Sequence, residues 1–470
     1  MTPDTRAGST VLTDVPPRLD RLPWSRWHER IILALGITWS LDGLEASLIA
    51  NMGPTLRDPR TLGLSALEVG LANSGYLLGE VAGALVFGHL TDRWGRKRLF
   101  FITLGLYLTA TACSGLAPSF AVFLALRFLA GSGIGGEYSA VNSAIDELIP
   151  ARVRGQVDLG INGSYWLGVA LAGGLTLVLL DPELVPIRFG WRFAFGLGAL
   201  LGLGVLVLRR HVPESPRWLL MHGYVAEAER TTTEIEHAVH GSRQSDVAPV
   251  RVRVTGVVGF RHLMQTLFVR YPRRTILGLV LMLAQTFFYN AIFFTYGLIL
   301  QRFHHVPAHR VGLYIVPFAV GNFAGPLVLG RLFDHWGRRV MIPATYAISG
   351  LLLLGTGVLF VEGRLDAFTQ TLCWCSVFFF ASAAASSAYL TVSELFPVEL
   401  RGLAIAVFYA IATTGGAIAP TLFGHIIDVG EPRRLFEGYA LASGLMIGAA
   451  IVARVLGVDS ERRSLESITS

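Results

Sequence analysis

Gly88-His-Leu-Thr-Asp-Arg-Trp-Gly-Arg-Lys-Arg98 is a short, polar and charged stretch between two long apolar runs. It returns 242 residues later as Gly330-Arg-Leu-Phe-Asp-His-Trp-Gly-Arg-Arg-Val340, with Gly, Asp, Trp, Gly and Arg in the same register. A second pair, Glu147-Leu-Ile-Pro-Ala-Arg-Val-Arg-Gly155 and Glu394-Leu-Phe-Pro-Val-Glu-Leu-Arg-Gly402, repeats at an offset of 247. Two repeats that keep their order and nearly their spacing indicate a duplicated architecture.

The composition is that of an integral membrane protein. Hydrophobic residues make up 52% of the chain and charged residues 15%, against about 25% charged in a soluble domain, and the mean hydropathy is +0.53. The net charge of +6 comes from basic residues in short loops, which is typical of topology signals and not of nucleic-acid binding. Cys113, Cys373 and Cys375 lie in apolar runs without metal-ligand spacing, so we expect no disulfide framework, metal site or cofactor.

Apolar runs of about 20 residues, long enough to cross a bilayer, occur twelve times. They lie at approximately 28–54, 66–88, 98–117, 119–146, 157–180, 190–209, 274–302, 309–331, 340–360, 366–393, 402–427 and 434–457. The sequence therefore predicts an all-α membrane protein with twelve transmembrane helices in two pseudo-symmetric six-helix bundles. Gly415, Gly416 and Pro420 predict a bend in the eleventh span.

The basic residues predict which side each loop faces. They fall on alternate loops, so both termini are expected in the cytoplasm and the protein in the cell (inner) membrane. Residues 1–27 lack the apolar core of a signal peptide and are expected to form a flexible N-terminal tail. The two bundles are predicted at 28–210 and 274–457. The linker 211–273 is expected to be partly helical without forming an independent domain, and 458–470 to be a C-terminal tail.

The first repeated motif has two interpretations. Its glycines predict a tight loop, its aspartate is placed to accept hydrogen bonds from backbone amides, and its arginines are placed to hold a carboxylate across the loop. Basic residues that only anchor a cytoplasmic loop are the simpler alternative. We favour a gating hinge, because the aspartate and the fixed Gly-Arg pair exceed what topology needs. The gating residues predicted from this motif are Gly88, Asp92, Gly95, Arg96, Asp334, Gly337 and Arg338.

Twelve spans with these two loop motifs resemble the major facilitator superfamily over about residues 25–466. Pro213-Glu-Ser-Pro-Arg-Trp-Leu219 and Ser460-Glu-Arg-Arg-Ser-Leu-Glu466 are similar to sugar-porter motifs, and Gln285 and Asn290 fall on the second Gln and the Asn of that family's Gln-Gln-x-x-Gly-x-Asn sugar-binding motif. The resemblance implies transport by alternating access between two halves. It also implies a cytoplasmic set of gating salt bridges that includes Glu147, Arg154, Glu394 and Arg401.

The sequence departs from the sugar-porter pattern where a sugar would bind. Ala284 and Phe288 replace the first Gln and the Gly of the binding motif, and Ala385-Ser386 stands where sugar porters usually have Gly-Pro. Gly133-Ile-Gly-Gly-Glu-Tyr-Ser139 in the fourth span is more similar to phosphate- and organic-acid/proton symporters of the same superfamily. Both a sugar and an organic acid therefore stay open as the substrate.

Ionisable residues inside the spans are concentrated in the first half. Asp42 and Glu45 lie in the first span, Glu80 in the second, and Arg127 and Glu137 in the fourth. A charge in the bilayer core is costly, so it is expected to face a cavity and to pair. Asp42 and Arg127 lie at similar depth, and we expect them to pair, as the corresponding residues do in proton-coupled sugar porters.

The expected pair is the candidate site of proton coupling. Protonation of Asp42 would release Arg127 and favour one of the two open states, whereas the alternative is a permanent structural pair. Glu45 follows Asp42 by three residues on roughly the same helix face, so either carboxylate can carry the proton. Glu137 is a candidate for binding a proton or a substrate cation, or for a structural contact. Glu80 is expected to be an interhelical hydrogen-bond partner.

Neutral polar side chains take the place of charges in the second half. Between Arg274 and Asp334 there is no acidic residue. This predicts a division of labour, in which the first half binds protons and the second half supplies much of the substrate contact. The candidate substrate-binding residues are Gln285, Tyr289, Asn290, Tyr296, Asn322, Ser386 and Tyr389.

The predicted function is proton-coupled symport of a small polar metabolite, a sugar or an organic acid, by two rocking halves. A passive facilitator or a proton-coupled exporter of the same fold is the main alternative, because a facilitator needs no membrane acid and the sequence fixes no direction. A solute sensor that signals through the linker is a further class, although the linker holds no recognisable effector. An enzyme is not expected, since no nucleotide loop or nucleophile–base motif lies outside the spans. The expected partners are substrate, proton and lipid bilayer, with no nucleic acid, and a monomer is the family default.

Overall fold

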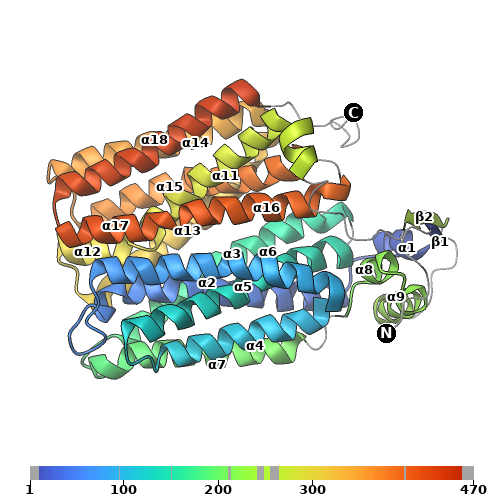
Figure 1. Ribbon diagram of the computed structural model, residues 1–470, viewed down its shortest axis with the longest axis horizontal. Helices are drawn as coiled ribbons and strands as arrows, with labels where there is room; N and C mark the ends of the chain where they lie inside the picture. The colour runs from blue at the N-terminus through green and yellow to red at the C-terminus, as the bar shows by residue number, and fades with distance from the viewer. Residues whose placement is uncertain are drawn as a thin grey trace.

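The apolar runs fold into helices because a backbone in lipid must satisfy its own N–H and C=O groups. The computed structural model describes residues 10–94, 96–149, 151–209, 213–240, 248–253, 264–395 and 398–457. Figure 1 shows two helical bundles packed along their length, the N-terminal half from blue to green and the C-terminal half from yellow to red. The fold is thus the expected pair of six-helix bundles.

Each half contributes six spans to the described structure. The N-terminal half consists of α2 (Arg26–Leu56), α3 (Ala66–Trp94), α4 (Arg96–Ser114), α5 (Phe120–Leu148), α6 (Ala151–Leu179) and α7 (Ile187–Arg209). The C-terminal half consists of α11 (Pro272–Phe293) with α12 (Tyr296–His304), α13 (Val311–His335), α14 (Arg338–Val361), α15 (Ala367–Leu395), α16 (Val398–Gly416) with α17 (Ile418–Val429), and α18 (Pro432–Leu456). Nine of the described helical runs are long and apolar enough to cross a membrane, and α4, α5 and α7 complete the twelve.

Two of the spans are broken near their middle. The eleventh changes from α16 to α17 at Ala417, directly after Gly415 and Gly416, so the predicted bend is confirmed. The seventh changes from α11 to α12 at Phe294 and Thr295. Both breaks lie in the C-terminal half, and both face the N-terminal half, because α17 packs on α3 and α12 on α2.

Small residues let the helices of the N-terminal half approach one another closely. A Cβ atom built on Gly79 of α3 would lie 2.1 Å from the carbonyl oxygen of Phe128 in α5. One built on Gly135 of α5 would lie 1.9 Å from the carbonyl oxygen of Glu80. These contacts, typical of small residues at helix crossings in lipid, bring the ionisable side chains of α3 and α5 together.

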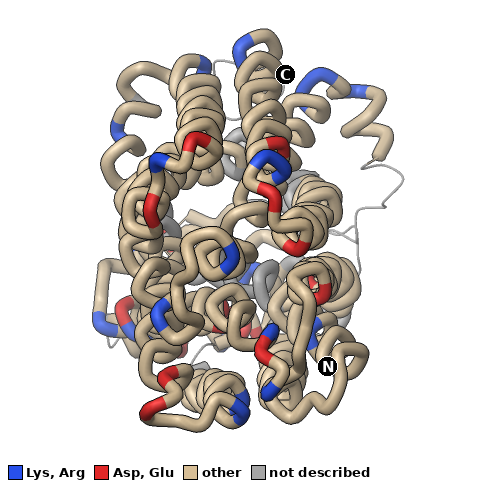
Figure 2. The backbone as a smooth tube through the Cα atoms, turned by 90° about the vertical axis from the view of Figure 1, so that its left-hand side faces the viewer, with Lys and Arg blue, Asp and Glu red and all other residues tan. Residues whose placement is uncertain are grey.

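The two halves touch mainly at one end, which we call the far end and which carries loops 57–65 and 430–431. The carboxylate of Asp428 in α17 accepts hydrogen bonds from the backbone N–H groups of Ala66 (2.9 Å) and Leu67 (2.7 Å) at the start of α3. Ser74 of α3 bonds to Thr421 of α17 at 2.7 Å. Figure 2 looks onto this end, where most charged residues lie in loops and at helix ends. In this conformation the far end is therefore held closed by contacts between the halves.

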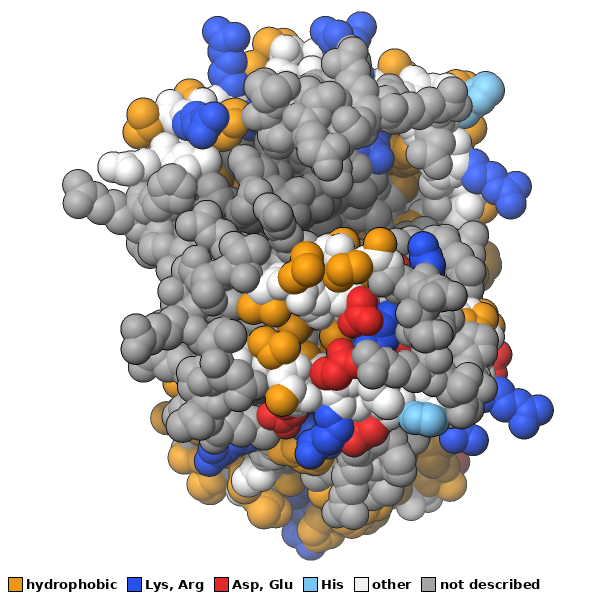
Figure 3. Space-filling model, turned by 90° about the vertical axis from the view of Figure 1, so that its right-hand side faces the viewer, with side chains coloured by type: hydrophobic (Ala, Val, Ile, Leu, Met, Phe, Trp, Pro, Cys, Tyr) orange, Lys and Arg blue, Asp and Glu red, His pale blue; other side chains and the backbone are white. Residues whose placement is uncertain are grey.

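The opposite end, which we call the linker end, carries a small folded unit. It comprises β1 (Thr10–Thr13), α1 (Val15–Arg21), α8 (Pro216–Met221), α9 (Val225–His240) and β2 (Val250–Arg253), with a π-helical turn, η1 (Thr266–Arg270), before α11. β1 pairs antiparallel with β2, and α1 packs on α8 and α9. Figure 1 shows this linker unit beyond the ends of the helices, and Figure 3 shows acidic and basic side chains side by side on that face.

The linker unit corrects our interpretation of the N-terminal tail. Residues 10–22 were expected to be flexible, and the linker was expected to be partly helical without forming an independent domain. Val15, Leu19 and Leu22 are instead buried, in an apolar cluster that includes Trp218 and Ile235 of the linker. The cause is a short amphipathic helix whose apolar face finds its partner on α8 and α9.

The repeated loop motif is also shorter than predicted. Gly88 lies inside α3 and its counterpart Gly330 lies inside α13, and a Cβ atom on either would meet nothing within 4 Å. The tight-loop prediction is therefore wrong for these two glycines. Gly337, between α13 and α14, has φ +82°, a conformation that L side chains rarely adopt, and so makes the turn. Arg338 is the first residue of α14, and its side chain is half-buried.

Candidate functional site

A buried ion pair lies inside the N-terminal half. Nη1 of Arg127 in α5 donates to Oε1 of Glu45 in α2 at 2.6 Å, and the two side chains are 0% and 2% exposed. Thr111 of α4 donates its hydroxyl to the same oxygen at 2.8 Å. Oε2 of Glu45 points toward α7, where a Cβ atom on Gly198 would lie 3.6 Å from it. Four helices thus enclose one carboxylate, with both donors on a single oxygen.

The guanidinium of Arg127 uses only part of its hydrogen-bonding capacity. Among the described residues, Nε and Nη2 of Arg127 have no hydrogen-bond acceptor. Its remaining contacts are aromatic, because the guanidinium carbon lies 4.6 Å from the ring centroid of Tyr76 and 5.6 Å from that of Phe195. Cation–π contacts stabilise a desolvated cation less than full ion pairing does. Arg127 is therefore held in place by one carboxylate and two rings.

The expected pairing of Asp42 with Arg127 is wrong in this conformation, since Glu45 takes that place. Asp42 is also buried, at 5% exposed, and it interacts electrostatically with Tyr165 of α6. The physical reason is geometric. Three residues of an α-helix turn the direction of a side chain by about 60°, and glutamate is one methylene longer than aspartate. Glu45 therefore reaches α4, α5 and α7, while Asp42 faces α6.

Glu80 of α3 connects this region to the C-terminal half. The hydroxyl of Tyr409 in α16 donates to Oε2 of Glu80 at 3.1 Å, which confirms the predicted hydrogen-bonding role. The Glu80 carboxylate also interacts electrostatically with Arg127, and the ring of Tyr76 is a neighbour of both. A series of contacts thus runs from Glu45 through Arg127 to Glu80 and across the interface to Tyr409.

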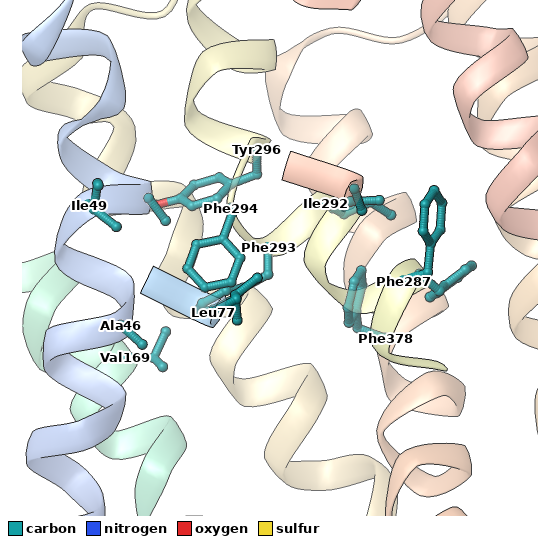
Figure 4. Packing of buried hydrophobic residues seen from close by; sticks show 14 of the residues in the cluster. Ala46, Ile49, Leu77, Val169, Phe287, Ile292, Phe293, Phe294, Tyr296 and Phe378 are labelled. Atoms are coloured by element: carbon teal, nitrogen blue, oxygen red, sulfur yellow. The ribbon is translucent and has the colours of Figure 1, made fainter. Parts of the chain in front are cut away.

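An aromatic cluster lies where α6 faces the C-terminal half. The centroid of Trp166 in α6 is 6.1 Å from those of Tyr289 and Phe293 in α11, and 6.2 Å from that of Phe318 in α13. Phe378 of α15 completes the cluster at 4.7 Å from Tyr289 and 4.4 Å from Phe318. Figure 4 shows Phe293 and Tyr296 projecting from the α11–α12 break toward α2, and Phe378 on the side away from α2. Trp166 and Tyr289 are half-buried, whereas the three phenylalanines are buried.

Two of the predicted substrate residues bond to each other. The hydroxyl of Tyr289 donates to Oδ1 of Asn322, and Nδ2 of Asn322 donates to the carbonyl oxygen of Phe318 at 3.0 Å. Ser382 of α15 donates to the backbone oxygen of Asn322 at 2.6 Å. Asn322 is 0% exposed, so this network orients the ring of Tyr289 instead of leaving the amide for a ligand.

Other predicted substrate residues have more varied positions. Asn290 is 8% exposed, and its Nδ2 has no acceptor among the described residues. Gln285 is also 8% exposed, with Thr286 as a neighbour at 3.5 Å. Tyr296 donates its hydroxyl to Asn51 of α2, which makes it part of the contacts between the halves. Ser386 is exposed and donates to the backbone oxygen of Ser382 at 3.1 Å.

Several predicted residues lie outside the described structure or have side chains that do. They are Asp92, Gly95, Arg96, Glu137, Glu147, Arg154, Asp334, Tyr389, Glu394 and Arg401. Their roles in proton coupling, gating and substrate contact stay predictions. Within the described residues, no group of three or more His, Cys, Asp or Glu side chains is placed to hold a metal ion.

Trp166 and Thr111 are site residues that sequence reasoning missed. Trp166 lies near the middle of α6, although tryptophans of membrane helices are enriched at the membrane–water interface. That unusual depth was a usable signal. Thr111 had none, because a threonine in an apolar span usually bonds to its own helix.

A family model described as "Sugar (and other) transporter" matches residues 42–470. The chain belongs to this family. Among the relatives of this sugar (and other) transporter, the niacin transporter NiaP of Acinetobacter baylyi is 28% identical and aligns over 97% of this chain and 99% of the relative. The putative metabolite transport protein YdjK of Escherichia coli is 27% identical over 96% of each chain. The protein is therefore a metabolite transporter of the membrane and not an enzyme.

Solved structures of the major facilitator superfamily share its fold. A crystal structure of a D-xylose-proton symporter aligns with a TM-score of 0.74 over 93% of this chain and all of that chain, at 18% identity. A partially occluded, inward-open conformation of the xylose transporter XylE from E. coli aligns with a TM-score of 0.73 over 94% and 100%, also at 18% identity. At this identity the likeness shows the fold, with its two six-helix halves.

Proposed function

We propose that this transporter imports a small polar metabolite together with a proton, and that Glu45 binds the proton. The observation that carries the proposal is the buried pair of Glu45 with Arg127, in which Arg127 uses one of its five N–H groups on a carboxylate. A neutral pair of this kind is a two-state element, because the addition of one proton removes the charge that compensates the arginine.

The proton acts by leaving Arg127 without its counter-ion. When one partner of a buried ion pair is lost, the remaining charge costs about 3–5 kcal/mol. That cost falls in a conformation that offers Arg127 another acceptor, so protonation favours that conformation over the present one. Oε2 of Glu45, on the Gly198 side, has no donor among the described residues and is the oxygen that takes the proton.

Glu80 is the acceptor that links this event to the second half. Its carboxylate already interacts with Arg127 and receives the hydrogen bond of Tyr409. A guanidinium that turns from Glu45 toward Glu80 competes with the Tyr409 hydroxyl for the same oxygens. The contact between the halves at this depth then weakens, which allows them to rock about the central site.

The closed far end identifies which state of the transport cycle the present conformation represents. We propose that the linker end faces the cytoplasm of the inner membrane, as the basic loops predict. The structure with its far end closed then corresponds to the inward-facing state, from which substrate and proton leave into the cell. The repeated motifs, with Gly337 at a turn, would close the linker end in the other half of the cycle, and a monomer would carry out the whole cycle.

The comparisons widen the choice of substrate. Two relatives carry niacin in their names, the A. baylyi transporter and the putative niacin/nicotinamide transporter NiaP of Bacillus subtilis, which is 24% identical over 85% of this chain. A pyridine carboxylate therefore joins sugars and other organic acids among the candidates for this chain. The sugar-motif residue Gln285 remains a candidate for substrate contact.

The test is proton movement during transport in proteoliposomes. The protein is reconstituted, and nicotinate, benzoate or xylose is added outside while external pH is followed. Substrate-triggered external alkalinisation is expected, and it should disappear in Glu45→Gln while counterflow exchange of the substrate survives. Asp42→Asn is the matched control, one turn away on the same helix, and should keep the alkalinisation.

Two outcomes would contradict the proposal. Uptake without any proton movement, equal in wild type and Glu45→Gln, would indicate a facilitator with a permanent structural pair. Loss of alkalinisation in Asp42→Asn alone would move the coupling proton to Asp42.

A further inference from the structure

We propose that the substrate is a small, flat aromatic acid, whose ring stacks on Trp166 and whose carboxylate is bound by the amide of Asn290. This inference rests on the proposed transport function and specifies its substrate class. It makes Trp166 the main determinant of specificity, a role that the sugar-porter motifs do not give to this position.

The first step concerns the surface that Trp166 presents. Its ring contacts with Tyr165, Phe293 and Phe318 are edge-on, with interplanar angles of 79°, 87° and 62°, and its contact with Tyr289 is tilted at 44°. Among the described residues no ring lies parallel to the indole. Aromatic pairs also favour offset-stacked arrangements, so a flat ligand would add a stacked contact that no described ring makes with this indole.

The second step concerns where that face points. Trp166 and Tyr289 are half-buried, although each contacts residues of the opposite half of the protein. A ring surface that is turned toward the opposite half of the protein does not face the lipid. The exposed part of both rings therefore faces the space between the two halves, which is where a transporter of this fold holds its substrate.

The third step concerns the polar groups of the described residues, few of which are left to bind a sugar. The hydroxyl of Tyr289 and the amide of Asn322 bond to each other, and Ser382 bonds to the Asn322 backbone. A polyhydroxylated ligand needs several placed donors and acceptors, since each unpaired polar group lowers affinity. The network instead fixes the orientation of an aromatic ring. A mainly apolar wall with few polar contacts fits a ligand that is mainly apolar.

The fourth step concerns the group that binds the acid. Nδ2 of Asn290 is buried and has no acceptor among the described residues, so it can donate to a carboxylate. It faces the break between α16 and α17, where a Cβ atom on Gly416 would lie 3.1 Å from it. Gly416 thus lets α16 pack closely against this face of α11. Asn290 follows Tyr289 directly on α11, so the two side chains point about 100° apart and a ligand that contacts both spans the two directions.

The fifth step concerns charge, and it explains why an anion and a proton travel together. The Glu45–Arg127 pair is neutral, and a proton on Glu45 raises the charge of this pair by one unit. A monocarboxylate bound nearby cancels that charge across a medium of low dielectric. Each ligand therefore raises the affinity for the other, as reciprocal linkage requires.

The experiment compares ligands that differ in one property. Binding to the purified full-length protein is measured by calorimetry with nicotinate, benzoate, cyclohexanecarboxylate, benzamide and xylose. Cyclohexanecarboxylate matches benzoate in charge and approximate size but has no π-system, whereas benzamide has the ring without the charge. We expect benzoate or nicotinate to bind at least about 5-fold more tightly than cyclohexanecarboxylate, as loss of ring stacking implies, and xylose not to compete.

Variants then locate the two contacts. Trp166→Phe is expected to keep affinity for the aromatic acid within about 3-fold, and Trp166→Leu to lower it by about 10-fold while leaving cyclohexanecarboxylate binding unchanged. Trp336→Leu, at an exposed tryptophan of the linker end, is the matched control and should have no effect. Asn290→Leu should lower affinity for benzoate and not for benzamide. Size-exclusion profiles check that each variant is folded, and the ligand series on wild type needs no variant.

The outcomes separate this inference from the proposed function. Equal binding of benzoate and cyclohexanecarboxylate, or binding of xylose without binding of either aromatic acid, would overturn the aromatic substrate class. If xylose then drove proton uptake, symport would stand without it. Uptake of an aromatic acid that depends on Trp166 but moves no proton would support the aromatic substrate class and contradict the proposed proton coupling.

Discussion

Two arginines among the described residues, Arg18 and Arg127, are fully buried, and they differ in how many carboxylates they contact. Arg18 of the linker unit donates to both oxygens of Glu236 (2.8 and 2.5 Å), to Glu229 (2.6 Å) and to Asp14 (3.3 Å). Arg127 of the membrane bundle donates to one oxygen of Glu45. A guanidinium whose N–H groups already have carboxylate acceptors is not stabilised further by a new acceptor. A guanidinium with unused N–H groups forms additional hydrogen bonds when a new acceptor approaches, and is stabilised by them.

This difference in pairing distinguishes the structural ion pairs of Arg18 from the Glu45–Arg127 pair, which we propose couples transport to a proton. Hydrogen bonds to Glu236 raise the pKa of Arg18 above its ordinary value even though burial opposes this. The carboxylates around Arg18 outnumber it, so loss of a single one leaves it paired. Arg127 has one carboxylate in contact, and one proton is enough to remove its compensation. Burial alone therefore does not identify a functional charge, but incomplete pairing within burial does.

The largest effect is expected from Arg127→Gln, which turns the working pair into a buried carboxylate without a cation. Glu45 then lacks its cation, and proton-driven accumulation should fall by about 100-fold or more, since a buried pair that loses one partner costs about 3–5 kcal/mol. The measurement is substrate accumulation in proteoliposomes under a pH gradient. The double variant Glu45→Gln/Arg127→Gln, with neither charge, should fold well and still not accumulate. Accumulation by either variant at the wild-type level would refute the role of the pair.

Arg18→Ala should lower stability and leave transport unchanged, in contrast to Arg127→Gln. It leaves Glu229 and Glu236 together without a cation, so the linker unit should lose about 3–5 kcal/mol of stability, while transport per folded molecule stays unchanged. Thermal unfolding and initial uptake rates measure the two quantities. Arg18→Met/Glu236→Leu should recover most of the stability, because well-packed apolar residues can replace a buried pair. A loss of coupling in Arg18→Ala would make the two arginines alike and remove the distinction.

Asp428→Asn tests a third carboxylate, one that joins the two halves. It bonds to two backbone N–H groups at the positive end of α3, and loss of its charge should weaken far-end closure by about 1–2 kcal/mol. Distances between spin labels on loops 57–65 and 430–431 should then show more of the open far end. Asp58→Asn is the control, since Asp58 bonds to Arg60 within its own loop. An unchanged distance distribution would mean that Asp428 does not hold the far end closed.

The smallest effect is expected from Tyr409→Phe, which removes the hydroxyl that bonds to Glu80. One hydrogen bond between a neutral and a charged group contributes about 1.5 kcal/mol, so the rate of exchange between states should rise by up to about 10-fold without a change in substrate affinity. Counterflow rates and equilibrium binding measure these separately. Tyr346→Phe removes a comparable bond, to the Leu281 oxygen at 2.9 Å, within one half and should leave the exchange rate alone. Equal rates in the two variants would exclude Glu80 as the link.

The fold was predictable because its causes are local. Long apolar runs, alternating basic loops and two repeats in register specify twelve spans and two halves without any contact between distant residues. The break at Ala417 followed from two glycines and a proline in a single span. The turn glycine Gly337 was also within reach, but the extent of the loop was not, since a helix in lipid can continue through Gly88 when no neighbour crowds it.

The candidate site was only partly predictable because it depends on rotation and distance. Sequence placed Asp42, Glu45 and Arg127 in one region, yet a difference of about 60° around α2 decided which carboxylate meets the arginine. Trp166 belongs to the site only because α6 faces α11 and α13, a contact that one chain does not reveal in its spacing. The docked tail likewise depended on partners more than 200 residues away.

That docked tail has a consequence for how the chain is made. Arg18 and Glu236 are 218 residues apart, so at the usual speed of synthesis α1 waits about 10–45 s before α9 leaves the ribosome. During that interval all six helices of the first half are synthesised, and Val15, Leu19 and Leu22 lack their contacts with α8 and α9. The tail closes onto α9 only after the first half is complete. Its docking therefore marks, in time, the point at which one half of the molecule is finished and the second begins.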